Sequence, residues 1–441
     1  MDKQLVSVVR YDEAARSVES AVALCDGLKG VPRDARTFIK PNIVFWTRRV
    51  PFPKWGVITT SRVVADVVAV LKAHGIEHVT IGEGMVTYDP KDVATPAHAF
   101  EMLGYRRLEE RYGVRCVNVH ERPFRTVDLG EGIRAKVNAD ILESDFVVDL
   151  PVLKTHSQTV VSLGVKNLKG CLDIASRKAF HDTRDGLDLH RKVAGLPGML
   201  PERSLTILDG IFTNERGPGF DGRIRRKDIL VASADWLSTD LVGAALLGYT
   251  PEEVPHLDYL VKKMGRAPDL RDIEIRGEMI ADHRLLHAYA FPYTKDGSLP
   301  VPMKRMGIEG LAYRQYDQTL CTYCALLSAA LVPAVARAWK GEPWKEVEVL
   351  TGKVMRPTPG KKKTILLGKC MYLANRNHPD IAEMLAVKSC PPSPEEIVDV
   401  FHRAGILIER GLIEDIEAVP GSFMQKYEGK PEFDEGLFRI P

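Results

Sequence analysis

The segment LPVLKTHSQTVVSLGVKNLKG places cationic and amide side chains directly after an apolar run. The run DFVVDLPVL predicts a buried strand, and Lys154 and His156 follow it. Further along, Lys166 and Asn167 interrupt an otherwise apolar stretch. A buried lysine is costly unless it is paired. The sequence therefore predicts a partner for these lysines, either a carboxylate such as Asp149 or a bound anion.

Other predicted strands end in side chains of similar chemistry. TFIK ends at Lys40, shortly before Asn42, while LTILDG and ILVASAD end near Asp209 and Asp235. Because the carboxyl ends of parallel strands meet at one edge of a sheet, we expect these groups to face one small volume. Charge-assisted hydrogen bonds contribute roughly 1.5–3 kcal/mol each, so such a volume suits an anion.

The chemistry of each group indicates its role. Lysine and asparagine side chains donate hydrogen bonds to anions, and imidazoles exchange protons near neutral pH. The aspartates would orient these groups or bind a metal. We predict a catalytic set of Lys154, His156, Lys166, His181 and Asp209. We predict a substrate-binding set of Lys40, Asn42, Asn167 and Asp235.

Each residue taken alone also has an ordinary structural interpretation. A lysine after a strand is commonly a solvated loop residue, Asn42 after a proline is a turn former, and aspartates cap helices. His181 could lie on the surface. The functional hypothesis depends on the coincidence at several strand ends. The sequence contains no Walker A loop and no Gly-x-Gly-x-x-Gly after its first strand, so a nucleotide cofactor is not supported.

A second set of reactive residues lies toward the C-terminus. Cys321 and Cys324 form a Cys-x-x-Cys, Cys370 follows the strand-like TILLGK, and Cys390 precedes two prolines. Iron–sulfur clusters accept scattered cysteines, and a proline after the last ligand recurs in ferredoxin-type sites. We therefore predict a [4Fe–4S] cluster on these four thiolates. Zinc, which favours two Cys-x-x-Cys pairs, and buried thiols are the alternatives.

The remaining three of the seven cysteines lie in apolar contexts and are interpreted as packing residues: Cys25, Cys116 and Cys171. An odd number of cysteines in a reducing compartment argues against a disulfide framework.

Strands alternate with helices through the first half of the chain, which predicts an α/β domain with a mostly parallel sheet covered by helices on both faces. We assign this domain to residues 1–300. DGSLPVPMKRMG resembles a linker, and residues 311–410 are predicted to form a smaller α+β iron–sulfur module. Residues 411–441, rich in polar residues, proline and glycine, are expected to wrap the surface.

The composition of the chain indicates which kinds of partner and location to expect. The chain has 441 residues, 45% of them hydrophobic and 27% charged, with a net charge of +2 and no long basic block. Nucleic acid is therefore not expected as the main partner. The N-terminus lacks a signal-peptide pattern, and no apolar run reaches membrane-spanning length. We expect a cytoplasmic protein without a membrane partner, and a homodimer is common at this size.

Several of these segments resemble the domain of unknown function 362 family. The likeness covers roughly residues 5–250 and is carried by IKPNIV, VVDLPVLKTHSQTVVSLGVKNLKGCL, His181, ILDGIFTNERGPGFDG and SADWLSTDLVGAALLG. The chain departs from the family pattern at Ser61, where proline is usual, and at Arg216, where glycine is usual. The resemblance implies an iron–sulfur protein, and the C-terminal cysteine segments are similar to a tail of some members.

The leading hypothesis is an iron–sulfur enzyme, either an oxidoreductase or a lyase, acting on a small anionic organic substrate. With all four cysteines bound the cluster would pass electrons to a partner, and with one free an iron could act as a Lewis acid. The alternative is a non-enzymatic electron-transfer or partner-binding protein, in which the strand-end lysines would be dispensable. A zinc-stabilised binding protein is the third hypothesis.

Overall fold

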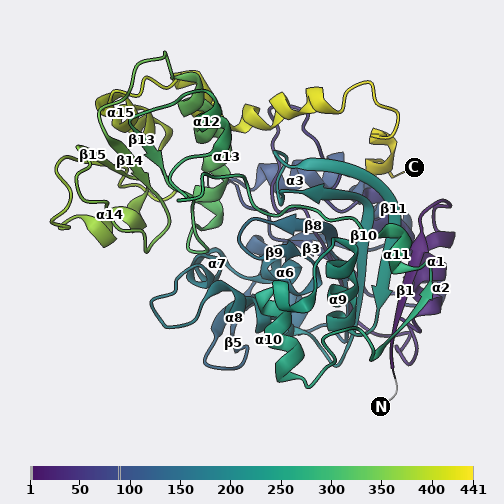
Figure 1. Ribbon diagram of the computed structural model, residues 1–441. Coiled ribbons are helices and arrows are strands. Elements are labelled where there is room, and N and C mark those ends of the chain that lie inside the picture. The colour runs from purple at the N-terminus through teal and green to yellow at the C-terminus, as the bar shows by residue number, and fades with distance from the viewer. Residues whose placement is uncertain (1–2, 88, 90, 441) are drawn as a thin grey trace. The chain divides into compact units, whose positions relative to one another are not determined.

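The computed structural model describes residues 3–87, 89 and 91–440 of the chain (Figure 1). It divides into two compact units, each with its own sheet. The first consists of Met1–Phe180, His190–Ala290 and Phe423–Pro441, and the second of His181–Leu189 and Phe291–Ser422. The sequence-based division into residues 1–300, 311–410 and a tail of 411–441 stays a prediction beside these two units.

In the described residues, the first unit is built on a ten-stranded mixed sheet with the order β12-β1-β11-β10-β7-β2-β3-β4, and β8 pairs with β10 and β9. Its strands are β1 (Gln4–Arg10), β2 (Thr37–Pro41), β3 (Val79–Glu83), β4 (Arg115–Asn118), β7 (Phe146–Leu150), β8 (Val152–His156), β9 (Val160–Ser162), β10 (Arg203–Glu215), β11 (Arg223–Ser233) and β12 (Ile273–Gly277). Most pairs are parallel, but β11 is antiparallel to both neighbours and β9 to β8. The predicted α/β class with a mostly parallel sheet is confirmed.

Strands β2, β7 and β8 are buried at every position. A strand that is covered on both faces needs apolar side chains on both, which explains the uninterrupted apolar runs of the sequence. The lysines and the aspartate of these strands are therefore held in the interior: Lys40 in β2, Asp149 in β7 and Lys154 in β8.

Helices of the first unit connect and cover these strands, and α1 and α9 both pack against β1 and β11 (Figure 1). They are α1 (Arg16–Leu24), α2 (Ser61–His74), α3 (Ala94–Met102), α4 (Tyr105–Tyr112), α5 (Ala139–Leu142), α6 (Gly164–Asn167), α7 (Ile174–Phe180), α8 (Leu189–Ala194), α9 (Trp236–Leu246), α10 (Pro255–Lys263) and α11 (Ile280–His283). Helix α2 ends at Gly75 with a φ of 95°, the left-handed conformation that glycine tolerates best. A separate antiparallel pair is formed by β5 (Phe124–Asp128) and β6 (Arg134–Asn138).

The second unit contains, in its described residues, a four-stranded parallel sheet, β13-β14-β15-β16. Its strands are β13 (Leu311–Tyr313), β14 (Val347–Leu350), β15 (Lys363–Leu366) and β16 (Met384–Ala386). Its helices are α12 (Val301–Arg305), α13 (Thr322–Arg337), α14 (Lys369–Asn375), α15 (Pro394–Ala404) and α16 (Arg410–Glu414). The sequence predicted one strand here, because strands of three or four residues are too short to show a periodicity.

A small apolar core stabilises the second unit. Leu350, Leu366 and Met371 are fully buried, and Ile381 and Met384 pack against them.

The end of the chain forms short 3-10 turns, Ile416–Lys426 and Glu435–Phe438. In the first unit, the indole Nε1 of Trp55 donates a hydrogen bond of 3.2 Å to the carbonyl oxygen of Asp434. This hydrogen bond connects the C-terminal segment, at Asp434, to Trp55.

Candidate functional site

A buried ion pair joins the ends of two neighbouring strands of the first unit. Lys40 Nζ in β2 lies 2.9 Å from Glu83 Oε2 in β3, and both side chains are at most 1% exposed. The carboxylate also accepts hydrogen bonds from the backbone amides of Ile43 (2.8 Å) and Gly84 (2.7 Å). Burial alone would raise the pKa of Glu83, but the charges of Lys40 and Arg177 outweigh it and lower this pKa. The Glu83 carboxylate is therefore held in its charged form.

A chain of hydrogen bonds links four further polar side chains. Lys154 Nζ donates to Asn42 Oδ1 (2.7 Å), and Asn42 Nδ2 donates to Asn167 Oδ1 (2.9 Å). Asn167 Nδ2 then donates to Asp149 Oδ1 (2.7 Å) and to the carbonyl oxygen of Lys40 (3.1 Å). Residues from β2, β7, β8 and α6, more than a hundred positions apart in the sequence, thus meet in one network.

Two lysines at this network have lowered pKa values. The partners of Lys154 Nζ are neutral oxygens, of Asn42 and of the Val57 carbonyl (2.7 Å each). Burial, followed by the charge of Lys166, lowers the pKa of Lys154 to about 7. Burial and Arg177 lower the pKa of Lys166 to about 7, and in the described part of the chain its ammonium makes no hydrogen bond or ion pair. Near neutral pH such amines can donate to an anion or exchange a proton.

The carboxyl groups beside these lysines are weak acids. Burial raises the pKa of Asp149 well above its ordinary value, and that of Asp209 as well. Asp209 accepts hydrogen bonds from the backbone amides of Thr60 (2.6 Å) and Ile211 (3.1 Å) and interacts electrostatically with Lys154. Burial therefore disfavours the charged form of these carboxyl groups as well as that of Lys154 and Lys166.

Three residues that position this site were not among the site residues predicted from the sequence. Asp240 in α9 accepts hydrogen bonds from the amides of Gly164 (2.7 Å) and Val165 (2.9 Å), which fixes the start of α6. Arg177 in α7 donates to the carbonyl oxygen of Gly84 (2.7 Å). Glu83 is the third, and its signal was present in the polar GEG that ends a strand.

Gly170, which ends the sequence KNLKG, covers the buried ion pair. A Cβ atom at this position would lie 2.5 Å from Lys40 Cε and 2.7 Å from Glu83 Oε1. The backbone must pass this close for the loop to enclose the pair, so the position requires glycine.

The other predicted site residues are distributed differently. His156 lies in β8 two positions after Lys154, on the same face of the strand, and its Nδ1 accepts a hydrogen bond from the Gln158 amide (3.1 Å). Asp235 does not join the network. Because β11 is antiparallel to β10, its carboxyl end points the other way, and Asp235 instead accepts from the Ser238 amide (2.8 Å) and pairs with Arg266 (3.0 Å).

His181 belongs to the second unit, where its Nδ1 lies 2.8 Å from the carbonyl oxygen of Gln318. A catalytic role for His181 stays a prediction.

The cysteines of the second unit interact with one another. A hydrogen bond with Cys324 lowers the pKa of Cys321 to about 5. That bond and burial raise the pKa of Cys324, and the thiols of Cys370 and Cys390 raise it further. A Cβ atom at Gly368 would lie 3.6 Å from Cys324 Sγ and 3.7 Å from Pro392 Cγ, so the segments that carry these cysteines approach each other there.

The described residues contain no group of three or more His, Cys, Asp or Glu side chains arranged to hold a metal ion between them. No helix in the described residues is both long enough and apolar enough to cross a membrane.

Comparisons with known proteins agree with the resemblance seen in the sequence. The family model described as domain of unknown function (DUF362) matches residues 37–245. Thylakoid-associated protein sll1697 of Synechocystis sp. is 28% identical over 261 residues, which are 57% of this chain and 76% of that protein. The lactate racemase apoprotein of Thermoanaerobacterium thermosaccharolyticum is 13% identical with a TM-score of 0.29, over 53% of this chain and 54% of that one. The chain thus spans about half the length of that solved structure. The DUF362 match, over residues 37–245, thus covers the part of the chain that carries the lysine and asparagine network.

Proposed function

We propose that the protein is an iron–sulfur enzyme that acts on a small organic anion. The second unit would hold a [4Fe–4S] cluster on Cys321, Cys324, Cys370 and Cys390. The first unit would bind the anion at its lysine and asparagine network. The observation that carries the proposal is that these four cysteines, from three separate stretches of sequence, interact in one unit.

The donor set suits the cluster. A [4Fe–4S] cluster takes one thiolate on each of its four iron atoms, so its ligands surround a larger group than a single metal ion. The chain offers four cysteines, with a proline directly after the last of them. When bound, the cluster would supply electrons for a redox step, or a Lewis-acidic iron if one cysteine is left free.

The first unit would bind and orient the substrate. Lys166, whose ammonium has no hydrogen-bonding partner in the described residues, would donate to a carboxylate or similar group, and Lys154 would contribute a second donor. With a pKa of about 7, either amine can hold or release a proton at neutral pH. His156, on the same face of β8 as Lys154, would be a second proton carrier. Asn42, held by Asn167, would keep the Lys154 ammonium in place.

Anaerobic purification followed by iron and sulfide determination tests the cluster. We expect about four of each per chain, the composition of a [4Fe–4S] cluster. Serine in place of any one of the four cysteines should lower both counts, whereas Cys116→Ser, in the first unit, should leave them unchanged. Zinc in place of iron, or equal counts in all variants, would contradict the proposal.

A second experiment tests the substrate site. Mass spectrometry of the small molecules released from the purified protein should identify an organic anion. The double variant Lys154→Met/Lys166→Met should no longer retain it, while its cluster content stays normal.

The alternative, an electron-transfer protein without a substrate, is favoured by one observation: Lys154 already has internal partners in Asn42 and Val57. It predicts that the double lysine variant still supports the electron transfer of the wild type.

A further inference from the structure

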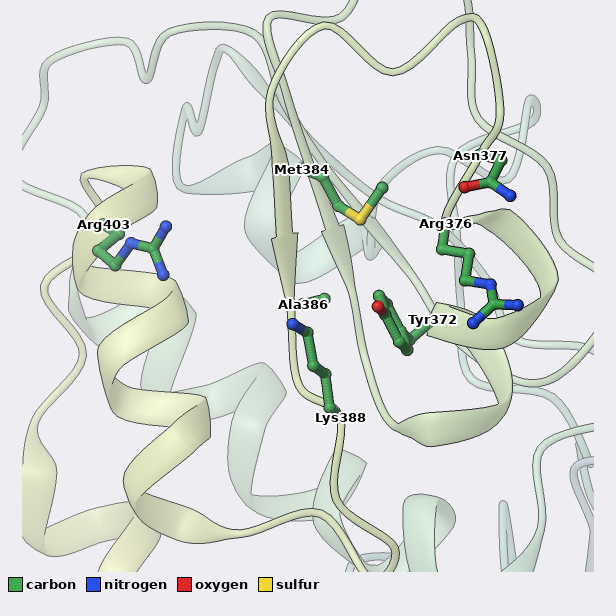
Figure 2. Close-up of a pocket in the computed structure, with 7 residues that line it drawn as sticks. All are labelled: Tyr372, Arg376, Asn377, Met384, Ala386, Lys388 and Arg403. Carbon is green, nitrogen blue, oxygen red and sulfur yellow. The ribbon is translucent and has the colours of Figure 1, made fainter.

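The second unit has a hollow whose lining includes none of the four cysteines of the proposed cluster site. Its volume is about 460 Å³, and it is lined by β16 and by residues of α14 and α15 and the segments next to them (Figure 2). The polar and aromatic residues of its lining are Tyr372, Arg376, Asn377, Lys388 and Arg403. A volume of roughly 300–1,000 Å³ is typical of sites for small molecules.

The lining is strongly cationic. Arg376, Lys388 and Arg403 contribute three positive charges, and none of the residues that line the hollow in the described structure is acidic. Arg403 pairs with Asp399, 3.5 Å away, and both side chains are more than half exposed. An ion pair as exposed as this contributes little, so it leaves the guanidinium open to a ligand.

Lys388 and Arg376 are positioned around an aromatic ring. The Lys388 ammonium lies 5.0 Å from the centre of the Tyr372 ring, and Figure 2 shows the two cationic side chains on either side of that ring. The carboxylate of Glu396 accepts hydrogen bonds from the backbone amides of Lys388 (2.8 Å) and Ser389 (3.1 Å), which fixes this segment. Arg376 has no ion pair in the described residues.

We propose that this hollow binds a compact organic anion with at least two negative groups, such as a polycarboxylate or a phosphate ester. Guanidinium groups from α15 and from the end of α14 would each take one carboxylate or phosphate in a bidentate contact. Tyr372 and Met384 would pack against the carbon skeleton. The site is distinct from the network of the first unit, and it does not require a metal cluster in the second.

Isothermal titration calorimetry on the full chain at low ionic strength tests this site, with citrate and inorganic pyrophosphate as probes. The titrations use the Lys154→Met/Lys166→Met background, so that binding in the first unit does not contribute. We expect one binding event per chain. Arg376→Gln and Arg403→Gln should each weaken it by about 10-fold or more, the effect of losing one charge-assisted contact.

Lys340→Gln removes an exposed charge of the second unit outside the hollow and should leave the affinity of the probes unchanged. Circular dichroism establishes that each variant folds. Equal affinities for the wild-type hollow and for the triple variant Arg376→Gln/Lys388→Gln/Arg403→Gln would overturn the proposal. Failure of both probes with binding of a poly-glutamate peptide would also overturn it, and would identify a docking surface for an acidic protein instead.

Discussion

Two kinds of buried lysine lie side by side in the first unit, and their partners distinguish them. Lys40 faces the carboxylate of Glu83 at 2.9 Å, so its charge is balanced. Lys154 faces an amide and a carbonyl oxygen, and its pKa falls to about 7. The first lysine holds two strand ends together, whereas the second can change its charge in the physiological range.

The Lys40–Glu83 pair should show strong coupling in a double-mutant cycle. Glu83→Gln leaves a buried ammonium without its counter-charge, and we expect it to lower the free energy of unfolding by about 3–5 kcal/mol. Lys40→Met/Glu83→Gln should recover a large part of that loss. Urea denaturation measures the free energy of unfolding of the single and the double variant. Glu346→Gln, at the exposed pair with Lys361, is the control and should change stability by about 0.5 kcal/mol or less. Additive losses in the double variant would contradict the expectation.

Lys154 should give the stability a pH dependence of known sign. Its pKa is about 7 in the folded protein and about 10.5 in the unfolded chain, so between these values the unfolded state binds more protons. The free energy of unfolding therefore rises from pH 7 to pH 10 by up to about 1.4 kcal/mol per pH unit from this group. Lys154→Met should lose that contribution.

Urea denaturation of the wild type and of Lys154→Met at pH 7 and pH 9.5 makes the comparison. The wild type should gain stability relative to the variant at the higher pH. A stability difference that stays constant across this range would show that the folded-state pKa of Lys154 is not lowered.

At the scale of elements, short segments place the site. Helix α6 carries Lys166 and Asn167, yet it has four residues and no stability of its own. Asp240 holds its first amides, and the following loop closes over Lys40 and Glu83 at Gly170. The network therefore depends on the contacts that α6 makes with α9 and with the strand ends.

Gly170→Ala should disturb the site through crowding. A methyl group would meet Lys40 Cε at 2.5 Å, and both members of the ion pair are too buried to move aside. We expect a loss of about 1–3 kcal/mol in the free energy of unfolding, the usual cost of overpacking. Gly411→Ala is the matched control, because nothing lies within 4 Å of its added carbon. Thermal denaturation compares the two variants, and equal stabilities would refute the close packing at Gly170.

At the scale of the whole molecule, the chain forms two units with separate sheets; the first carries one candidate site and the second carries two. The lysine and asparagine network is confined to the first, and the four cysteines with the cationic hollow to the second. Each unit can therefore be perturbed through its own core.

Leu366→Ala should loosen the second unit. Leu366 is fully buried against Leu350 and Met371, and truncation of such a leucine costs about 2–5 kcal/mol. Hydrogen–deuterium exchange should become faster in β14, β15 and β16, while amides of β2 and β7 keep their protection. Equal acceleration in both sheets would show that the two units unfold as one.

The sequence by itself determined the class of the main sheet, because strands buried on both faces need long apolar runs. It also determined which polar residues break those runs: Lys40, Asn42, Lys154 and Asn167. Lys154, Asn42 and Asn167 meet in one hydrogen-bond network that includes the carbonyl oxygen of Lys40, and the Lys40 side chain pairs with Glu83. The pattern of apolar and polar residues reflects burial directly, so this part of the site could be predicted from the sequence.

Tertiary structure decided the rest. The antiparallel direction of β11 turned Asp235 away, and the assignment of His181 to the second unit followed from packing. The partners Glu83, Arg177 and Asp240 come from other elements, and a single sequence does not state which distant carboxylate faces which lysine. The short strands of the second unit have no periodicity to detect. The physical reason is the same in each case: strand direction, pairing and charge balance are set by contacts between segments, whereas the sequence records only the environment that each residue prefers.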